Sequence, residues 1–301
     1  MIRKVQRAAL DEAKYNACVE EAMQSSIFGF SWYLDQVVEQ WEVLVLDDYE
    51  AVMPIPKRRK WFISYVYPPL WLIQLGIFSK VAVDENEFLI ALFDDYRFVE
   101  LRLNAGNHPS FFKEYQKDKT LQILSLSPSY EALLAKYNRN RKRELQKAVK
   151  HDLTEKWSDS PHALIQLFEK NVGKRVRHIK AEDYQRLLRL MQHCLAEKKG
   201  ELLTVYDKDN ELVAGAFFLK HKKRVTELVC SSDFSNRKNG ANTFMNDRAI
   251  FKYQKHFDVF DFGGSSMPGI AKYYKSFGAK DEHYYQLHYN ELPKLLKLVK
   301  S

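Results

Sequence analysis

The stretch Ser235-Asn236-Arg237-Lys238-Asn239-Gly240-Ala241-Asn242 joins a predicted strand to a predicted helix and so gives the strongest indication of the fold. Residues 225–232 have the pattern of a strand, and residues 240–255 have that of a helix. Amide groups in the first turn of a helix point toward an anion, and a glycine there lets a phosphate approach. The stretch therefore predicts an anion site, although a plain helix start after a polar loop fits the same residues.

Two further stretches follow in the same half of the chain. Phe260-Asp261-Phe262-Gly263-Gly264-Ser265-Ser266 is typical of a short buried strand that ends in a turn. Backbone and hydroxyl donors at the carboxyl edge of a sheet lie where open α/β sheets bind ligands. Asp261 can equally cap nearby amides of a turn. We expect a cleft lined by Asp261, Gly263, Gly264 and Ser265.

The predicted elements occur twice in the same order: helix, helix, hairpin, strand, helix, strand, helix, strand. The acidic turns at 47–50 and 207–210 occupy equivalent places in the two halves. This repetition predicts a duplicated α/β (α+β) unit with mixed, mostly antiparallel sheets. We expect an N-terminal unit at 1–128, basic linking helices at 129–150 and a C-terminal unit at 151–301.

The composition excludes several classes of protein. The chain has 301 residues, of which 46% are hydrophobic and 29% charged, as in ordinary globular proteins. No apolar run approaches the ~18–20 residues of a membrane-spanning helix, and no apolar segment typical of a secretory signal follows the charged start. The 3 cysteines are few and far apart, which disfavours disulfides and indicates a cytoplasmic protein.

Other catalytic motifs are missing from the sequence. It contains no His-Glu-x-x-His or Cys-x-x-Cys spacing for a metal, and no Gly-x-Ser-x-Gly nucleophile turn. It also lacks a Walker loop and the Gly-x-Gly-x-x-Gly fingerprint of dinucleotide-binding proteins. We therefore expect no metal site.

Positive charge is concentrated in residues 136–150, within a chain whose net charge is +8. This segment has seven Lys or Arg residues and one acid, Glu144. Such a run favours an anionic partner, which would be a phosphate-bearing small molecule or RNA, although a solvated helix face is equally consistent with it. Arginine suits phosphate well. The candidate anion-binding residues are Arg139, Arg141 and Arg143.

The element order resembles the GNAT N-acyltransferase fold, and two such units with a basic helix resemble the Fem-type aminoacyl transferases. Those enzymes add amino acids to peptidoglycan precursors from aminoacyl-tRNA. The 235–242 stretch is similar to the GNAT pyrophosphate loop, which it matches at Arg237 and Gly240 and departs from at Asn242, where a side chain would crowd a pyrophosphate. The resemblance implies donor phosphate binding by Arg237, Gly240, Ala241 and Asn242.

The 260–266 stretch resembles the end of the fifth strand in Fem-like enzymes, and Ala271–Ala279 resembles a GNAT helix end. Tyr274 falls on the tyrosine that protonates the leaving thiolate in many GNAT enzymes. Fem-type enzymes carry a lysine nearby, so the resemblance leaves the catalytic role open between Tyr274 and Lys275. Either Glu227 or Asp233 could accept the proton of the substrate amine.

The resemblance implies an N-acyltransferase that moves an acyl or aminoacyl group from an activated donor to a primary amine. Acyl-CoA or aminoacyl-tRNA would be the co-substrate, with no permanently bound cofactor. Peripheral contact with a lipid-linked precursor is a further expectation. The alternatives are an acyl-CoA-dependent N-acetyltransferase and a non-catalytic module that binds a phosphate-rich ligand through residues 136–150. Because Pro68 and Pro69 remove amide donors, we expect the first unit to shape the acceptor cleft and not to bind the donor.

Overall fold

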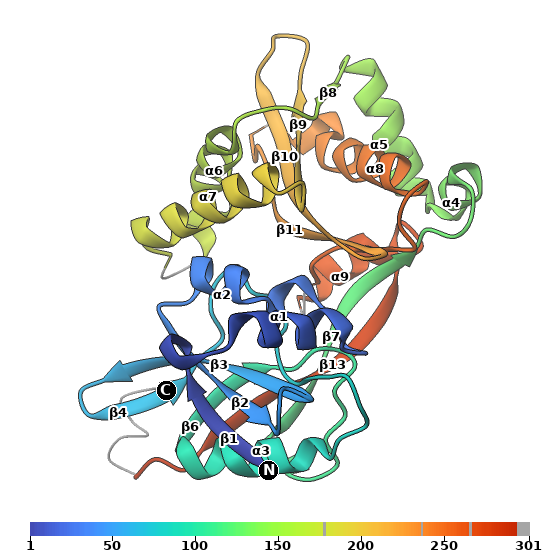
Figure 1. The fold of residues 1–301 in the computed structure, drawn as a ribbon. Coiled ribbons are helices and arrows are strands. Elements are labelled where there is room, and N and C mark those ends of the chain that lie inside the picture. Colours follow the sequence, from blue (N-terminus) through green and yellow to red (C-terminus); the bar gives the residue numbers. More distant parts are fainter. Residues whose placement is uncertain (177–178, 236, 265–266, 294–301) are drawn as a thin grey trace. The chain divides into compact units, whose positions relative to one another are not determined.

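The computed structural model describes residues 1–176, 179–235, 237–264 and 267–293 (Figure 1). The chain forms two compact units, Met1–Lys119 with His283–Ser301, and Thr120–Glu282. This division differs from the expected boundaries in three ways, one of which is that residues 120–128 belong to the second unit. The basic helices belong to the second unit, and the end of the last strand belongs to the first, because residues 286–290 pair with residues 98–102.

The sheet of the first unit is mostly antiparallel, with parallel pairing only between β4 and β6 among the pairs described. Its strands, in spatial order, are β1 (Ile2–Gln6), β2 (Gln40–Leu46), β3 (Ala51–Lys60), β4 (Ile63–Val66), β6 (Phe98–Arg102) and part of β13 (Lys280–Asn290), with β5 (Phe78–Ser79) beside β3. Its helices are α1 (Glu12–Glu21), α2 (Ser31–Val37) and α3 (Glu85–Asp95).

The sheet of the second unit is also mostly antiparallel, with β11 and β12 parallel. Its strands, in spatial order, are β7 (Gln116–Ser125), β12 (Val259–Asp261), β11 (Arg224–Ser232), β10 (Leu212–His221), β9 (Gly200–Tyr206) and β8 (Thr154–Lys156). Its helices are α4 (Tyr130–Lys136), α5 (Arg139–Lys150), α6 (Pro161–Lys170), α7 (Ala181–Ala196), α8 (Ala241–Tyr253) and α9 (Pro268–Lys275). None of the helices described is long and apolar enough to cross a bilayer.

Local sequence signals explain many of the element boundaries. Asp84 caps α3 by accepting a hydrogen bond from the Asn86 amide at 2.9 Å. Ser160 caps α6, whose first residue is Pro161. The two acidic turns lie between β2 and β3 and between β9 and β10, as the duplicated pattern predicts. The mixed, mostly antiparallel fold class is therefore confirmed.

Several local predictions were wrong. The basic run 57–60 after Pro56 suggests a turn in the sequence but extends β3, because the Lys57 ammonium pairs with the buried Glu42 carboxylate next to it on β2. The sequence of residues 110–116 suggests a helix, but these residues contain only the 3₁₀ turn Lys113–Tyr115. Strand β1 was not predicted. The helix predicted at 292–300 lies mostly outside the described residues.

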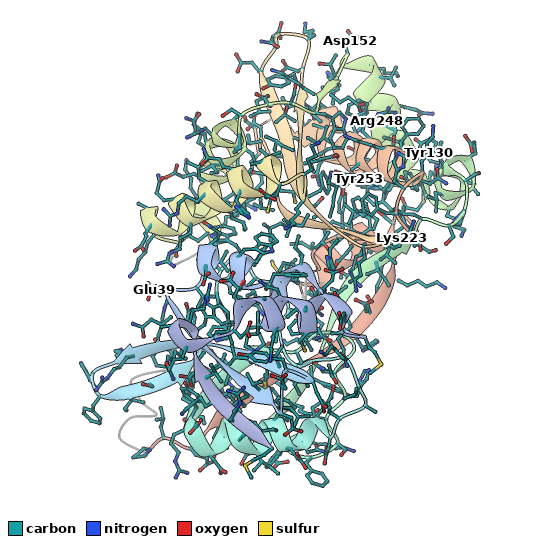
Figure 2. All side chains as sticks on the ribbon, in the orientation of Figure 1. Glu39, Tyr130, Asp152, Lys223, Arg248 and Tyr253 are labelled. Atoms are coloured by element: carbon teal, nitrogen blue, oxygen red, sulfur yellow. The ribbon has the colours of Figure 1, made fainter. Side chains whose placement is uncertain are left out.

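The core of the second unit is rich in aromatic side chains. Tyr253 of α8 is buried against Phe218 and Phe260, and its hydroxyl donates to Glu201 Oε2 at 2.9 Å (Figure 2). Tyr130 of α4 donates to Asp247 Oδ1 of α8 at 2.9 Å. These contacts join α4 to the middle of α8 and fix the C-terminal end of α8 against the core of the unit.

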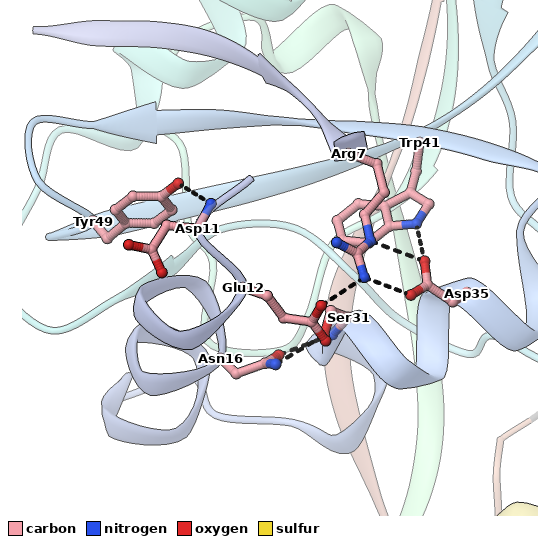
Figure 3. Close-up of polar contacts among 8 residues, drawn as sticks. All are labelled: Arg7, Asp11, Glu12, Asn16, Ser31, Asp35, Trp41 and Tyr49. Carbon is pink, nitrogen blue, oxygen red and sulfur yellow. Dashed lines mark hydrogen bonds and ion pairs between the residues drawn. The ribbon is translucent and has the colours of Figure 1, made fainter. Parts of the chain in front are cut away.

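A polar network in the first unit joins α1, α2 and β2 (Figure 3). The Arg7 guanidinium donates to Asp35 Oδ2 at 2.8 Å and to Glu12 Oε2 at 2.9 Å. Trp41 Nε1 donates to Asp35 Oδ1 at 2.8 Å, and Ser31 Oγ donates to Glu12 Oε1 at 2.8 Å. Each of these charged groups thus has an opposite charge or a hydrogen-bond partner.

Candidate active site

A pocket of about 600 Å³ lies within the second unit, at the N-terminal end of α8. This volume is in the range of small-molecule sites. Its walls come from the end of β11, the first turn of α8, helix α9 and one side of α5. The residues that line it include Arg141, Cys230, Asp233, Asn242, Tyr273 and Tyr274.

The course of β11 accounts for the position of this pocket. β11 pairs with β12 over Arg224–Thr226 and then continues to Ser232, so its second half lies beyond the pairing. In the pairing with β10, Phe217 faces Val229 and Phe218 faces Glu227. Leu228 between them has no partner on β10 and forms a bulge. Such a bulge re-aims neighbouring side chains and is common beside active sites.

Glu227 is a buried carboxyl group behind the pocket wall, with only 3% of its surface exposed. Burial raises its pKa to about 7, although hydrogen bonds from Cys230 and Tyr274 lower it in part. The Tyr274 hydroxyl donates to Glu227 Oε1 at 3.3 Å, and Oε2 has no hydrogen-bond partner among the described residues. A carboxyl group with this pKa is suited to accept a proton near neutral pH.

Tyr274 lines the pocket and stacks on Phe262, with ring centroids 4.6 Å apart. Burial raises the pKa of its phenol well above 10, so the hydroxyl keeps its proton at neutral pH. The neighbouring Lys275 has 46% of its side chain exposed and pairs with Asp281 at 2.5 Å. Of the two candidates from the sequence, Tyr274 is therefore the one in the pocket wall.

The N-terminal end of α8 lines the pocket through Gly240, Ala241, Asn242 and Thr243. Its first turn carries no acidic residue, and Asn239 Oδ1 accepts from the Ala241 amide at 2.9 Å. Gly240 has a φ of +83°, and a Cβ there would lie 2.3 Å from the Glu144 carbonyl oxygen. The glycine is thus required by packing against α5, whereas the sequence had suggested approach of an anion.

Two guanidinium groups line the same pocket. Arg141 Nη1 donates to Thr243 Oγ1 at 2.7 Å, and its guanidinium lies over the Tyr273 ring at 4.4 Å. Arg175, which the sequence analysis missed, lies over the Phe234 ring at 4.1 Å. No motif surrounds Arg175, so only the fold identifies it.

The other basic candidates lie elsewhere. Arg139 and Arg143 are exposed on α5 and are not among the residues that line this pocket. The side chain of Arg237 lies outside the part of the chain that the structure describes. Among the basic candidates whose side chains are described, Arg141 therefore lines the pocket, and Arg139 and Arg143 do not.

The remaining candidates divide between the pocket and the strand end. Asp233 lines the pocket, and its carboxylate accepts from the Ser235 amide at 3.0 Å. Asp261 is buried and accepts from Arg224 Nη2 at 2.8 Å and from the Gly263 amide at 2.9 Å. These contacts indicate that Asp261 stabilises the end of β12 and the turn after it.

The glycine residues after Asp261 also have structural roles. A Cβ on Gly264 would lie 2.3 Å from Leu121 Cβ, so this glycine allows close packing. Gly263, with a φ of +71°, takes part in the turn that Asp261 caps. Ser265 lies outside the described residues. The structure thus places Asp261, Gly263 and Gly264 apart from the described lining of the pocket.

Comparison with known families gives a match over this unit. Residues 135–276 match the model of the acetyltransferase (GNAT) domain. This span includes α5, β11, α8 and α9, which together form the pocket. A search of curated proteins finds no match to the sequence.

Solved structures with the same fold cover nearly the whole chain. A crystal structure of FemX has a TM-score of 0.65 at 12% identity and covers 99% of both chains. The C-terminal domain of a putative lysylphosphatidylglycerol synthetase from Agrobacterium fabrum has a TM-score of 0.58 at 11% identity, with 93% of this chain and 92% of that chain covered.

A third similar structure supports the duplication. The tandem GNAT protein from the clavulanic acid biosynthesis pathway has a TM-score of 0.56 at 10% identity, covering 98% of this chain and 100% of that chain. The tandem fold predicted from the repeated elements is thereby confirmed. Residues 135–276 therefore match the acetyltransferase (GNAT) domain, and the chain has a tandem GNAT-like fold similar to that of FemX.

Proposed function

We propose that the protein transfers an acyl group from a phosphate-bearing activated donor to a primary amine, with the reaction centred on Glu227 and Tyr274. The observation that carries the proposal is their 3.3 Å contact at the wall of a pocket that also contains the N-terminal end of α8. A proton acceptor, a proton donor and an anion site thus lie in one unit. Acyl transfer to an amine needs these three elements.

The donor binds through its phosphate groups in this proposal. The first-turn amides of α8 face the phosphate, and the guanidinium of Arg141 adds charge-assisted hydrogen bonds. Arg141 already donates to Thr243 and lies over Tyr273, so its planar group is held in place at the pocket. Its Nε atom is buried without a hydrogen-bond partner among the described residues, which leaves one donor for a ligand.

The chemical step moves one proton in each direction. The substrate ammonium first loses one proton to solvent. The ionised Glu227 carboxylate then takes a second proton from the amine nitrogen, directly or through water, as that nitrogen forms a bond to the carbonyl carbon of the donor. As the bond from that carbon to the leaving sulfur or oxygen breaks, Tyr274 donates its proton to the leaving atom. The hydrogen bond between Tyr274 and Glu227 then returns the proton held by Glu227 to the phenol.

The narrower form of the proposal is Fem-like. In this form the donor is an aminoacyl-tRNA and the acceptor is the amine of a lipid-linked peptidoglycan precursor, whereas acyl-CoA is the donor of the simpler form. The three cysteines are all free, which supports a reducing compartment such as the cytoplasm.

The test is an assay of the purified protein with a panel of acyl-CoAs and aminoacyl-tRNAs, each paired with small primary amines. The expected result is an amide product whose mass equals that of the amine plus the parent carboxylic acid, less water. Glu227→Gln should form this product roughly 10²–10⁴-fold more slowly, because the amide side chain cannot take the proton.

A thermal-shift screen with the same donors tests binding separately. A donor that binds only the folded chain raises its melting temperature. Donor binding without product in the wild type, for every amine tried, would favour a non-catalytic phosphate-binding module. Product formation that is unchanged in Glu227→Gln would contradict the proposed base.

A further inference from the structure

The hairpin of β3 and β4 ends in two large exposed aromatic residues. Lys60 pairs with Ile63 in the antiparallel register, so Trp61 and Phe62 form a two-residue turn. Their exposed fractions are 65% and 74%. Figure 1 shows the hairpin in light blue, extending beyond the neighbouring strand β2. Exposed adjacent aromatic side chains at a projecting tip are typical of an interaction site.

The backbone of this turn does not account for the tryptophan. Trp61 has a φ of +55°, in the left-handed region where hairpin turns favour Gly, Asn or Asp. A bulky residue in this region is uncommon and strained. Arg59 Nε donates to the Trp61 carbonyl oxygen at 3.1 Å and holds the turn. The turn thus holds Trp61 with its large side chain exposed at the tip.

Cations lie directly behind the aromatic tip. Lys57 pairs with Glu42, and the Arg58 Nε atom lies 3.4 Å from Glu39 Oε2, so the charges of these two residues are balanced within the unit. Arg59 and Lys60 are both exposed on the last residues of β3. The tip thus presents an apolar end with two cations immediately behind it.

We propose that this tip is an anchor for an anionic lipid surface: Trp61 and Phe62 enter the headgroup layer while Arg59 and Lys60 bind lipid phosphates. The order of groups along the hairpin matches a bilayer, where aromatic rings lie at the interface and cations contact the headgroups. A single-stranded nucleic acid would stack its bases on open ring faces. Here Lys60 Nζ lies over the Trp61 ring, 5.7 Å from its centroid, and occupies one face.

The experiment is vesicle flotation of the full chain, with vesicles of phosphatidylcholine alone and of phosphatidylcholine mixed with phosphatidylglycerol. The wild type should bind the mixed vesicles, and binding should weaken at high salt. Trp61→Ala/Phe62→Ala should lose binding to the mixed vesicles by at least ~10-fold. Arg59→Ala/Lys60→Ala should lose roughly 10- to 30-fold on the mixed vesicles, and no more than a few-fold on the neutral ones.

A matched control removes an exposed aromatic residue and a nearby cation elsewhere in the same unit. Phe111 is 58% exposed and Lys113 is exposed near it, so Phe111→Ala/Lys113→Ala should bind vesicles like the wild type. Glu227→Gln should also bind like the wild type, which separates this proposal from the proposed reaction.

Three results would overturn the proposal. The first is a wild type that binds neither kind of vesicle, and the second is equal loss of binding in the control variant. The third is binding of a single-stranded oligonucleotide, and not of vesicles, that is lost in Trp61→Ala/Phe62→Ala. This last result would make the tip a nucleic-acid site.

Discussion

Helices α3 and α8 hold equivalent places in the two units, and their N-terminal ends have opposite character. The first turn of α3 follows Asp84 and contains Glu85 and Glu87. The Glu85 carboxylate accepts from Asn107 Nδ2 at 2.7 Å and from the His108 amide at 2.6 Å. The first turn of α8 has no acid, follows a glycine and lines a pocket. Only α8 therefore leaves its positive end available to an external anion.

The polar clusters of the two units differ in the same way. In the first unit, Arg7 and Asp35 belong to a network in which each charged group has a partner (Figure 3). In the second, Glu227 Oε2, Arg141 Nε and the Tyr273 hydroxyl are buried without a hydrogen-bond partner among the described residues. An unsatisfied buried polar group costs about 1–3 kcal/mol of stability. The first unit also has such a group, Gln74 Nε2, but Arg141 and Tyr273 both line the pocket of the second unit, where such groups are typical of a functional site.

The largest expected effect comes from Glu227→Gln. This change keeps the size of the side chain but removes the proton acceptor, so turnover should fall by roughly 10²–10⁴-fold. The measurement is steady-state kinetics with the donor and amine found active for the wild type. A variant with wild-type turnover would remove Glu227 from the mechanism.

The role of Glu227 as the base can also be tested by comparing the pH dependence of the wild type and Glu227→Gln. Only the ionised Glu227 can take a proton, so wild-type kcat/KM should rise with pH through about 7. Stability should change in the opposite direction. The pKa is higher in the folded state, at about 7, than the ordinary 4.5, so this stabilising contribution is complete below pH 4.5 and lost as pH rises through about 7.

The contribution of Glu227 can be isolated by urea unfolding of both proteins across that pH range. The free energy of unfolding of Glu227→Gln, relative to that of the wild type, should be higher above pH 7 than below pH 4.5. The reason is that the variant has no carboxylate to bury. Parallel pH profiles of the free energy of unfolding would show that burial does not perturb this group.

Tyr274→Phe should have the next largest effect. It keeps the ring stacked on Phe262 and removes only the hydroxyl, so folding and donor binding should persist while turnover falls by ~10²-fold or more. Its matched control is Lys275→Gln, which breaks an exposed pair with Asp281 and should change turnover by less than ~3-fold. The opposite ranking of the two variants would move the acid to Lys275.

The basic residues of α5 should contribute unequally to donor binding, depending on whether they line the pocket. Arg141→Gln should weaken donor binding by roughly 10-fold, because it removes a charged donor at the pocket. Arg139→Gln/Arg143→Gln changes exposed residues and should cost only a few-fold, with the loss shrinking as salt rises. Isothermal titration at two salt concentrations measures both. Equal losses would indicate a diffuse basic surface in place of a pocket contact.

The smallest effect on turnover is expected for Asp35→Asn in the first unit. The amide keeps one acceptor for Trp41 but weakens the ion pair with Arg7, which is partly exposed. Stability should drop by about 1 kcal/mol, whereas turnover per folded molecule should stay unchanged. Loss of turnover at full stability would contradict the supporting role of this network.

Much of the fold could be predicted from sequence because its signals are local. Asp84 and Ser160 mark helix starts, and the two acidic turns mark the hairpins. Residues 57–60 were misassigned because their partner, Glu42, lies on another strand. The pairing of residues 286–290 with β6 could not be predicted from the sequence either, because it joins segments far apart in the chain.

The site was predicted in part for the same reason. Tyr274 and Asn242 belong to contiguous motifs that the sequence displays, and both line the pocket. The choice of Tyr274 over Lys275 required the contact with Glu227, which depends on a bulge in β11. Arg175 lies in a segment without a motif, and the packing of Gly240 against α5 depends on tertiary structure.

The central claim, that donor phosphate binds at the N-terminal end of α8, is tested most directly by placing an acid there. Asn242→Asp gives α8 the acidic first turn that α3 already has, and it preserves the helix because acids are favoured at this end. The measurement is isothermal titration of coenzyme A and of deacylated tRNA into the wild type, Asn242→Asp and the control Glu85→Gln. Whichever ligand binds the wild type should lose at least ~10-fold in affinity with Asn242→Asp and none with Glu85→Gln. Wild-type affinity in Asn242→Asp would contradict this claim.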